Sequence, residues 1–190
     1  MESETGQIKI FIVDDHQILI DGLRSLLEDV PDFSIVGSTT EPGVVLEILK
    51  QQAVDVLLTD VMMPVLNGKQ LAQKVRLHFP NIKILALSMS GQGDVVDAMI
   101  NDADINGYVL KNIGKTELTK AITKIAGGSF YFSDEVLIEL EKQANNKKES
   151  EAAHLTIREK EIIGLIEKEL NNKEIAERRC SWAGFFFLGQ

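Results

Sequence analysis

The sequence predicts an α/β protein built on a five-stranded, doubly wound parallel sheet, followed by a linker and a small, incomplete α-helical domain. Short apolar runs rich in β-branched residues alternate five times with apolar stripes at helical spacing, and the connections between them are short. In addition, several of these runs stop at a charged or hydroxyl-bearing residue. Open α/β sheets bind their ligands at the carboxyl ends of their strands, so this second observation points to one functional edge.

The expected elements follow one another in a regular order. Strands are expected over residues 8–13, 34–37, 54–60, 82–87 and 107–110. Helices are expected where the apolar stripes lie, over residues 18–27, 44–49, 71–79, 95–100 and 118–125. Pro42 lies in the first turn of the second helix, a position that tolerates proline because no amide donor is needed there. The third strand is an apolar run flanked by turn residues, which fits a strand buried on both faces of the sheet.

The second half of the chain has a different pattern. Ser133 and the acidic residues after it predict the start of a helix that ends at about Lys142, and the polar, turn-rich residues 143–150 predict a linker. Thr156 and Glu159 repeat the spacing of a capping box, which predicts another helix start. We therefore divide the chain into residues 1–130, the α/β domain; 131–150, a helix and linker; and 151–190, a partial helical domain with an unusual C-terminal sequence.

Composition limits the class of protein. With 190 residues, of which 44% are hydrophobic and 26% charged, the chain can bury an ordinary globular core. No apolar run approaches the roughly 20 residues that span a bilayer, and the acidic N-terminus is unlike a signal peptide. The single cysteine, Cys180, fits a reducing compartment, so we expect a cytoplasmic protein without a membrane partner. The net charge of −9 disfavours nucleic-acid binding except through a small separate module.

Polar side chains gather at the expected strand ends. Asp14 and Asp15 follow the first strand, Asp60 ends the third, Ser88 follows the fourth and Lys111 follows the fifth. Three carboxylates at one edge repel one another unless a cation joins them, and a hard divalent ion such as Mg²⁺ is the natural partner for oxygen ligands. With a lysine and a hydroxyl nearby, the set resembles an anion site built around a carboxylate nucleophile.

Residues 8 to about 127 resemble the receiver domain of a two-component response regulator, which has a flavodoxin-like fold. The resemblance rests on Val13-Asp14-Asp15-His16, on Thr59-Asp60-Val61-Met62-Met63-Pro64 with Gly68, on Leu87-Ser88, and on Gly107-Tyr108-Val109-Leu110-Lys111. It implies that a sensor histidine kinase phosphorylates Asp60. It also implies a protein that is not an enzyme beyond its own phosphotransfer and slow autodephosphorylation.

The resemblance also assigns roles to the surrounding residues. Asp14, Asp15, Asp60 and the backbone carbonyl of Met62 would hold Mg²⁺. Ser88 and Lys111 would contact the phosphate, and Tyr108 would be an aromatic switch that turns inward as Ser88 moves. Homodimerisation through the fourth helix, fifth strand and fifth helix is a further implication. Plainer interpretations exist for single residues: Asp14 and Asp15 as a helix cap, Ser88 as a turn residue, Tyr108 as a packed aromatic and His16 as a polar residue at the start of the first helix.

A narrower resemblance covers the second half. The segments 128–133 and 155–162 resemble the NarL/FixJ subgroup, in which a LuxR-type helix-turn-helix domain follows the linker, and residues 172–178 match the first helix of that pair. The match stops at Arg178, because the remaining residues are rich in glycine and phenylalanine. After Lys173 the only basic residues are Arg178 and Arg179, too few for a recognition helix that must contact bases and phosphates. We expect a truncated DNA-binding half and little DNA binding by this chain.

Two other functions remain open. The first is a stand-alone receiver that acts through protein partners without DNA. The second is an aspartate-nucleophile phosphohydrolase. Haloacid-dehalogenase-type enzymes need a second acid two residues after the nucleophile, where this chain has Met62, and this counts against the hydrolase.

Overall fold

The protein folds around a parallel sheet, as the sequence predicts. The computed structural model describes residues 6–149, and the expected elements and domain beyond Glu149 lie outside these described residues. Six strands pair in the order β2-β1-β3-β4-β5-β6, and every pairing is parallel. The strands are β1 Ile8–Val13, β2 Phe33–Thr39, β3 Val56–Asp60, β4 Lys83–Ser88, β5 Gly107–Leu110 and β6 Tyr131–Phe132.

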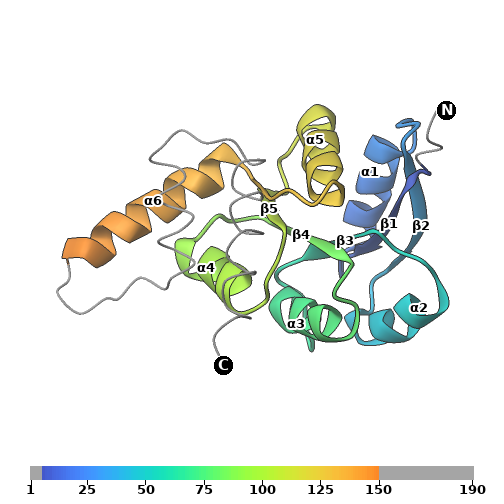
Figure 1. The fold of residues 1–190 in the computed structure, drawn as a ribbon, viewed down its shortest axis with the longest axis horizontal. Helices are drawn as coiled ribbons and strands as arrows, with labels where there is room; N and C mark the ends of the chain where they lie inside the picture. The colour runs from blue at the N-terminus through green and yellow to red at the C-terminus, as the bar shows by residue number, and fades with distance from the viewer. Residues whose placement is uncertain (1–5, 150–190) are drawn as a thin grey trace, which may run out of the picture.

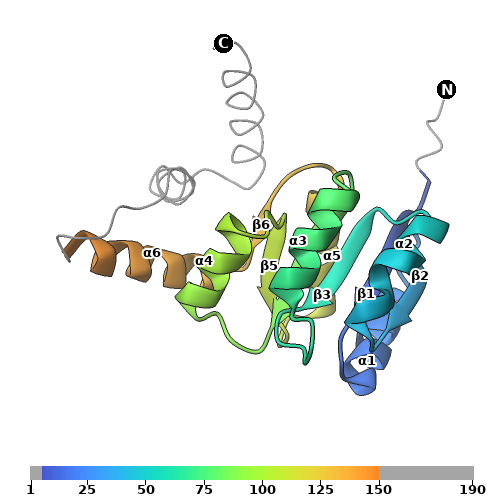
Figure 2. The same cartoon turned by 90° about the horizontal axis from the view of Figure 1, so that it is seen from below.

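Helices cover both faces of this sheet (Figures 1 and 2). They are α1 Gln17–Leu27, the 3₁₀ helix η1 Pro42–Val44, α2 Val45–Gln51, α3 Gly68–His78, α4 Gly93–Asn101, α5 Lys115–Ala126 and α6 Asp134–Glu149. One apolar cluster lies between the sheet and α2, α3, α4 and α6, and a second lies between the other face and α1 and α5. Since β3 is buried along its whole length, the expectation of a strand covered on both faces is confirmed. Within the described residues no helix is long and apolar enough to cross a membrane.

The strand order creates the crevice in which the polar residues meet. The chain runs from β1 outward to β2 and then back to β3 on the other side of β1. Helical connections therefore diverge above the carboxyl ends of β1 and β3, which is the switch point where doubly wound folds bind ligands. The register pairs Val13 with Thr59, so Asp14 and Asp60 leave the sheet at the same level.

The last two elements of the described structure, β6 and α6, differ from those expected from the sequence. A sixth strand, β6, pairs with β5, and its two residues are too few to show a periodic pattern in the sequence. Pairing depends on Gly107, where a side-chain Cβ would lie 2.6 Å from the carbonyl oxygen of Tyr131. The helix α6 continues past Lys142 to Glu149, through residues for which the polar sequence predicted a linker.

Asp104, in the connection between α4 and β5, has a positive φ of 51°. Aspartate tolerates this left-handed conformation better than most residues with a side chain. Arg76 stabilises the turn, because its Nη2 donates to the Asp104 carbonyl oxygen at 2.7 Å and its Nε lies 3.2 Å from Asp104 Oδ2.

Candidate phosphoacceptor site

Three buried side chains from three strands meet at the centre of the site. Asp14 directly follows β1, Asp60 is the last residue of β3, and Lys111 directly follows β5. Lys111 Nζ lies 2.7 Å from Asp14 Oδ2 and 3.0 Å from Asp60 Oδ2. The side chains of Lys111, Asp14 and Asp60 are 7%, 2% and 4% exposed, respectively, so water screens the charges of this group little. The structure thus brings together the residues that the sequence placed at separate strand ends.

The loop after Asp60 is folded tightly against the strand it leaves. The Met62 amide donates to Asp60 Oδ1 at 3.3 Å, and the Gly68 amide donates to the Val61 carbonyl oxygen at 3.0 Å. A Cβ at Gly68 would lie only 2.1 Å from the Asp60 carbonyl oxygen, so only glycine allows α3 to begin this close to Asp60. The Met62 side chain is 69% exposed, and its backbone is the part that takes part in the site.

The carboxylates form a group that fits a divalent cation. One ligand atom from each of Asp14, Asp15, His16 and Asp60 lies within 4.8 Å of the others. Asp15 Oδ1 is buried and accepts no hydrogen bond, and His16 Nδ1 lies 3.1 Å from it. A buried carboxylate oxygen without a donor is a suitable ligand for Mg²⁺, which prefers carboxylate oxygens.

The balance of charges in the site also favours a divalent cation. Burial raises the pKa of Asp60 above its usual value, the hydrogen bond and charge of Lys111 oppose that rise, and the neighbouring charge of Asp14 adds to it. Three carboxylates and one ammonium leave an excess of negative charge, which a divalent ion removes. The acidic group is therefore compatible with a bound divalent cation, and Lys111 places a positive charge beside it.

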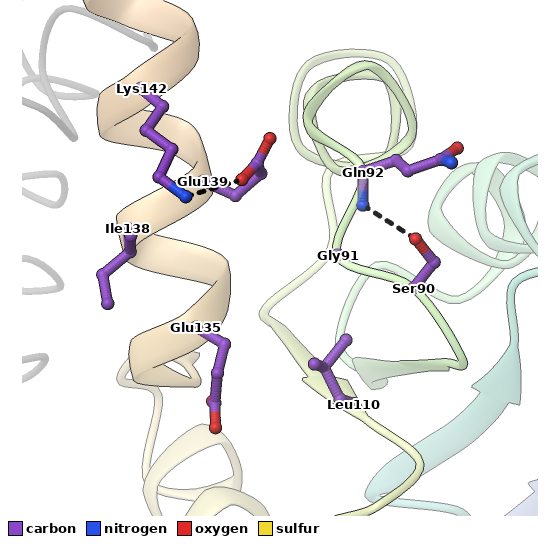
Figure 3. Close-up of a pocket in the computed structure, with 8 residues that line it drawn as sticks. All are labelled: Ser90, Gly91, Gln92, Leu110, Glu135, Ile138, Glu139 and Lys142. Atoms are coloured by element: carbon purple, nitrogen blue, oxygen red, sulfur yellow. Dashed lines mark hydrogen bonds and ion pairs between the residues drawn. The ribbon is translucent and has the colours of Figure 1, made fainter.

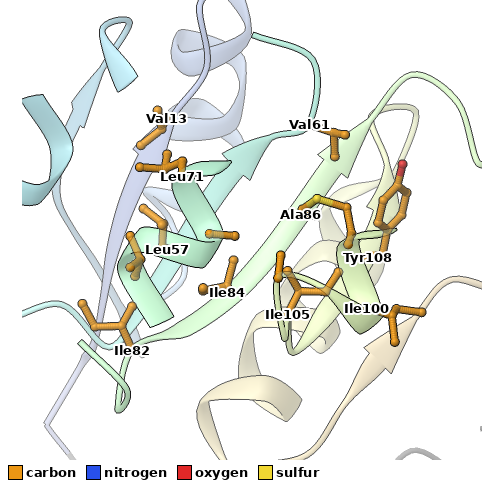
Figure 4. Close-up of a cluster of buried hydrophobic side chains, with 14 of the residues drawn as sticks. Val13, Leu57, Val61, Leu71, Ile82, Ile84, Ala86, Ile100, Ile105 and Tyr108 are labelled. Atoms are coloured by element: carbon orange, nitrogen blue, oxygen red, sulfur yellow. The ribbon is translucent and has the colours of Figure 1, made fainter. Parts of the chain in front are cut away.

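Ser88 and Tyr108 lie next to this centre. Ser88 is the last residue of β4 and is buried, and Leu87 before it pairs with Asp60 in the sheet register. Tyr108 on β5 is fully buried, with its ring in the apolar cluster that also holds Ile100 (Figure 4), and its hydroxyl donates to the Ser90 carbonyl oxygen at 2.9 Å. Burial raises the pKa of Tyr108 and the charge of Asp60 adds to the rise, while the Ser88 hydroxyl opposes it as a donor to the phenolate.

Two partners in this site were not predicted from the sequence. His16 was preferred as a polar surface residue at the start of the first helix over a metal ligand; it does precede α1 and is exposed, and its Nδ1 lies near Asp14 and Asp15. Ser90 receives the Tyr108 hydroxyl and its amide donates to Ser88 Oγ at 3.2 Å. The sequence Ser88-Met89-Ser90-Gly91 has the composition of an ordinary turn, so no pattern in it indicates these contacts.

Known proteins match the chain over both its sequence and its fold. The family model described as "Response regulator receiver domain" matches residues 10–123. The chain is 32% identical over 175 residues to the transcriptional regulatory protein MctR of Rhizobium johnstonii, covering 92% of this chain and 80% of MctR. It is also 32% identical over 173 residues to the nitrate/nitrite response regulator protein NarL of Escherichia coli K12, covering 89% of this chain and 79% of NarL.

A solved structure agrees with these relatives. The isolated REC domain of RcsB from Salmonella enterica serovar Typhimurium, in the presence of the phosphomimetic BeF3−, superposes with a TM-score of 0.63 at 30% identity. The match covers 69% of this chain and 96% of that domain. The predicted resemblance to receiver domains and to the NarL-type regulators is thus confirmed. The chain belongs to the response regulators of two-component systems and carries their receiver domain.

Proposed function

We propose that this response regulator accepts a phosphoryl group on Asp60 from a sensor histidine kinase and thereby controls transcription in the cytoplasm. The observation that carries the proposal is the convergence of Asp14, Asp60 and Lys111 on one another at the strand ends, beside the unsatisfied oxygen of Asp15. A relative whose receiver was solved with a phosphomimetic supports the same chemistry.

In the proposed transfer, a carboxylate oxygen of Asp60 forms a bond to phosphorus as the bond from phosphorus to the kinase's histidine nitrogen breaks. The bonding electrons return to that nitrogen. Mg²⁺, held by Asp14, Asp15, Asp60 and the Met62 carbonyl oxygen, would supply positive charge to the phosphoryl oxygens. Lys111 is already 3.0 Å from Asp60 and supplies a fixed positive charge at the place where the phosphoryl group arrives.

Ser88 and Tyr108 are proposed to report the phosphoryl group. Phosphorylation adds about 1.5 to 2 negative charges and three acceptor oxygens beside the buried Ser88 hydroxyl. The hydroxyl would donate to one of these oxygens and draw the turn at Ser88–Ser90 inward. Tyr108, bonded to Ser90, is then held in its buried position. A buried Tyr108 is already the arrangement in this structure, so phosphorylation would stabilise a state the unmodified chain can adopt.

We propose no enzymatic activity beyond this self-phosphotransfer and slow autodephosphorylation. A phosphohydrolase of the haloacid-dehalogenase type needs an acid two residues after its nucleophile, and Met62 is apolar there with an exposed side chain. Met62 therefore supplies no proton donor for rapid turnover.

For the output, the names of the relatives favour transcriptional control. The sequence after Arg178 is poor in basic residues, so we propose that this chain alone binds promoter DNA weakly, and a gel shift at stated salt tests this. Tight, sequence-specific binding would contradict it. Action through protein partners without DNA is the alternative output that the same glycine- and phenylalanine-rich sequence favours, and a regulator active in cells without any gel shift would support it.

The acceptor assignment is tested by incubating the protein with acetyl phosphate and Mg²⁺ and measuring its intact mass. We expect one added phosphoryl group in the wild type and none in Asp60→Asn. The matched control is Asp29→Asn, which alters a carboxylate that is 80% exposed and should leave labelling unchanged. Labelling that persists in Asp60→Asn, or that is lost in both variants, would contradict the assignment.

A further inference from the structure

The helix α6 packs on the side of the domain that faces the switch residue. Its apolar face, including Val136 and Leu140, is buried in the same cluster as Tyr108 and the residues of α4. In both views of the fold α6 runs beside α4 (Figures 1 and 2). A second copy was expected to pair through the surface of α4, β5 and α5, and the chain's own α6 packs on α4 and β5 of that surface.

Tyr108 contacts both the switch turn and the start of α6. Its side-chain hydroxyl donates to the Ser90 carbonyl oxygen at 2.9 Å, on the site side. Its backbone carbonyl oxygen accepts from the Ser133 amide at 3.1 Å, on the α6 side. The Ser133 carbonyl oxygen in turn accepts from the Leu137 amide at 3.0 Å in the first turn of α6. A continuous set of hydrogen bonds therefore joins the turn after Ser88 to the helix.

The turn and the helix also approach each other directly. A shallow groove separates Ser90, Gly91 and Leu110 on one side from Glu135 and Ile138 of α6 on the other (Figure 3). A Cβ at Gly91 would be 3.8 Å from Val136 Cγ2 and 3.6 Å from Leu110 Cδ2. A single added methyl group on the turn would therefore reach van der Waals contact with α6. A movement of the turn therefore alters the distance between the turn and α6.

We propose that α6 is a mobile reporter of the acceptor site, and that a phosphoryl group on Asp60 tightens its docking on α4 and β5 through Tyr108. The inference rests on the proposed phosphorylation of Asp60. Its sign follows from the packing: the docked helix places Val136 and Leu140 in the cluster that holds the buried Tyr108 ring, so docking and ring burial stabilise each other. A phosphoryl group that favours the buried ring must therefore favour docked α6, and by linkage docked α6 must favour the phosphoryl group.

The test is hydrogen exchange of the α6 amides over residues 137–142 in the full chain, with Mg²⁺ alone and with Mg²⁺ plus beryllofluoride. Intact mass after acetyl phosphate treatment reports acceptor chemistry separately. We expect exchange in wild-type α6 to slow at least about fivefold when the acceptor is occupied, the lower end of common allosteric couplings. Tyr108→Phe removes the bond to Ser90 and should reduce this slowing to less than about twofold while the acceptor is still phosphorylated.

The matched control is Tyr131→Phe on the adjacent strand β6. Its hydroxyl bonds to Glu117 at 3.2 Å and not to the turn, so the variant should respond like the wild type. Unchanged α6 exchange in a wild-type protein whose acceptor is phosphorylated would overturn the inference and leave the proposed function standing. Failure of phosphorylation itself would overturn the proposed function. An equal loss of response in both tyrosine variants would also overturn the role of Tyr108.

Linkage supplies a second, independent measurement. Leu140→Asp puts a charge on the buried face of α6 and should release the helix without touching the acceptor site. If the coupling exists, calorimetric titration with beryllofluoride in Mg²⁺ should show an affinity reduced by the same factor by which occupancy slowed exchange. Retained slow exchange in β1 to β5 shows that the variant is folded. Unchanged affinity in a folded Leu140→Asp protein would overturn the inference.

Discussion

Replacement of Lys111 by methionine gives the sharpest test of the site's electrostatics. The substitution keeps the length of the side chain and removes the one charge that lies 2.7 Å from Asp14 and 3.0 Å from Asp60. Breaking a buried charge pair by deleting one partner costs about 3–5 kcal/mol, because the other charge stays buried and unpaired. Asp60 can relieve part of this cost by binding a proton. We therefore expect the free energy of unfolding to fall by about 3 kcal/mol at neutral pH in EDTA.

Urea denaturation measures this loss, and Mg²⁺ tests its cause. The variant site has one more uncompensated negative charge, so Mg²⁺ should stabilise Lys111→Met more than it stabilises the wild type. Lys115→Met is the control: its ion pair with Asp29 is 3.8 Å long and exposed, and its loss should change the free energy of unfolding by less than about 1 kcal/mol. A Lys111→Met protein as stable as the control in EDTA, or equally stabilised by Mg²⁺, would refute the reasoning.

The remaining predictions concern the residues around the acceptor. In EDTA, Asp60→Asn should remove the Asp60 contribution to the pH dependence of stability. Burial raises the folded pKa of Asp60, so this carboxyl stabilises the fold below its unfolded pKa of 3.8 and loses that contribution as pH rises through the folded pKa. Urea midpoints across acidic to neutral pH measure the difference. Gly68→Ala should destabilise by about 1–3 kcal/mol and weaken Mg²⁺ binding, measured by calorimetry, because its Cβ would strike the Asp60 carbonyl oxygen. Val65→Asn should raise the free energy of unfolding measured by urea denaturation by about 1 kcal/mol. Val65 is a fully exposed β-branched residue with a φ of 66°, a left-handed conformation that asparagine adopts more readily.

The sequence was sufficient for the first five strands of the sheet and for the centre of the site, for one physical reason. In a parallel sheet all carboxyl ends share an edge, so residues such as Asp14, Asp60 and Lys111 can be placed together once the strands are recognised. No distance between them has to be known.

Other features depend on packing that no local pattern records. The strand β6 has two residues, and its pairing is fixed by the close approach of Tyr131 to Gly107. The polar sequence 143–149 predicted a linker, yet it continues the helix α6. The contact from Tyr108 to Ser90 joins a strand to an ordinary turn. The β6 pairing and the Tyr108–Ser90 bond are tertiary contacts between segments whose own composition is indifferent to them.

The position of Tyr108 explains why input and output can be linked in so small a domain. Successive residues of a strand point to opposite faces, but the backbone groups of every residue point sideways to the neighbouring strands. A residue on β5 therefore lies between β4, which carries Ser88, and β6, which leads into α6. Tyr108 uses its side chain for the turn after β4 and its carbonyl oxygen for Ser133 after β6. Because the same residue bonds to both sides, the proposed coupling between Asp60 and the first turn of α6 needs no longer path through the domain.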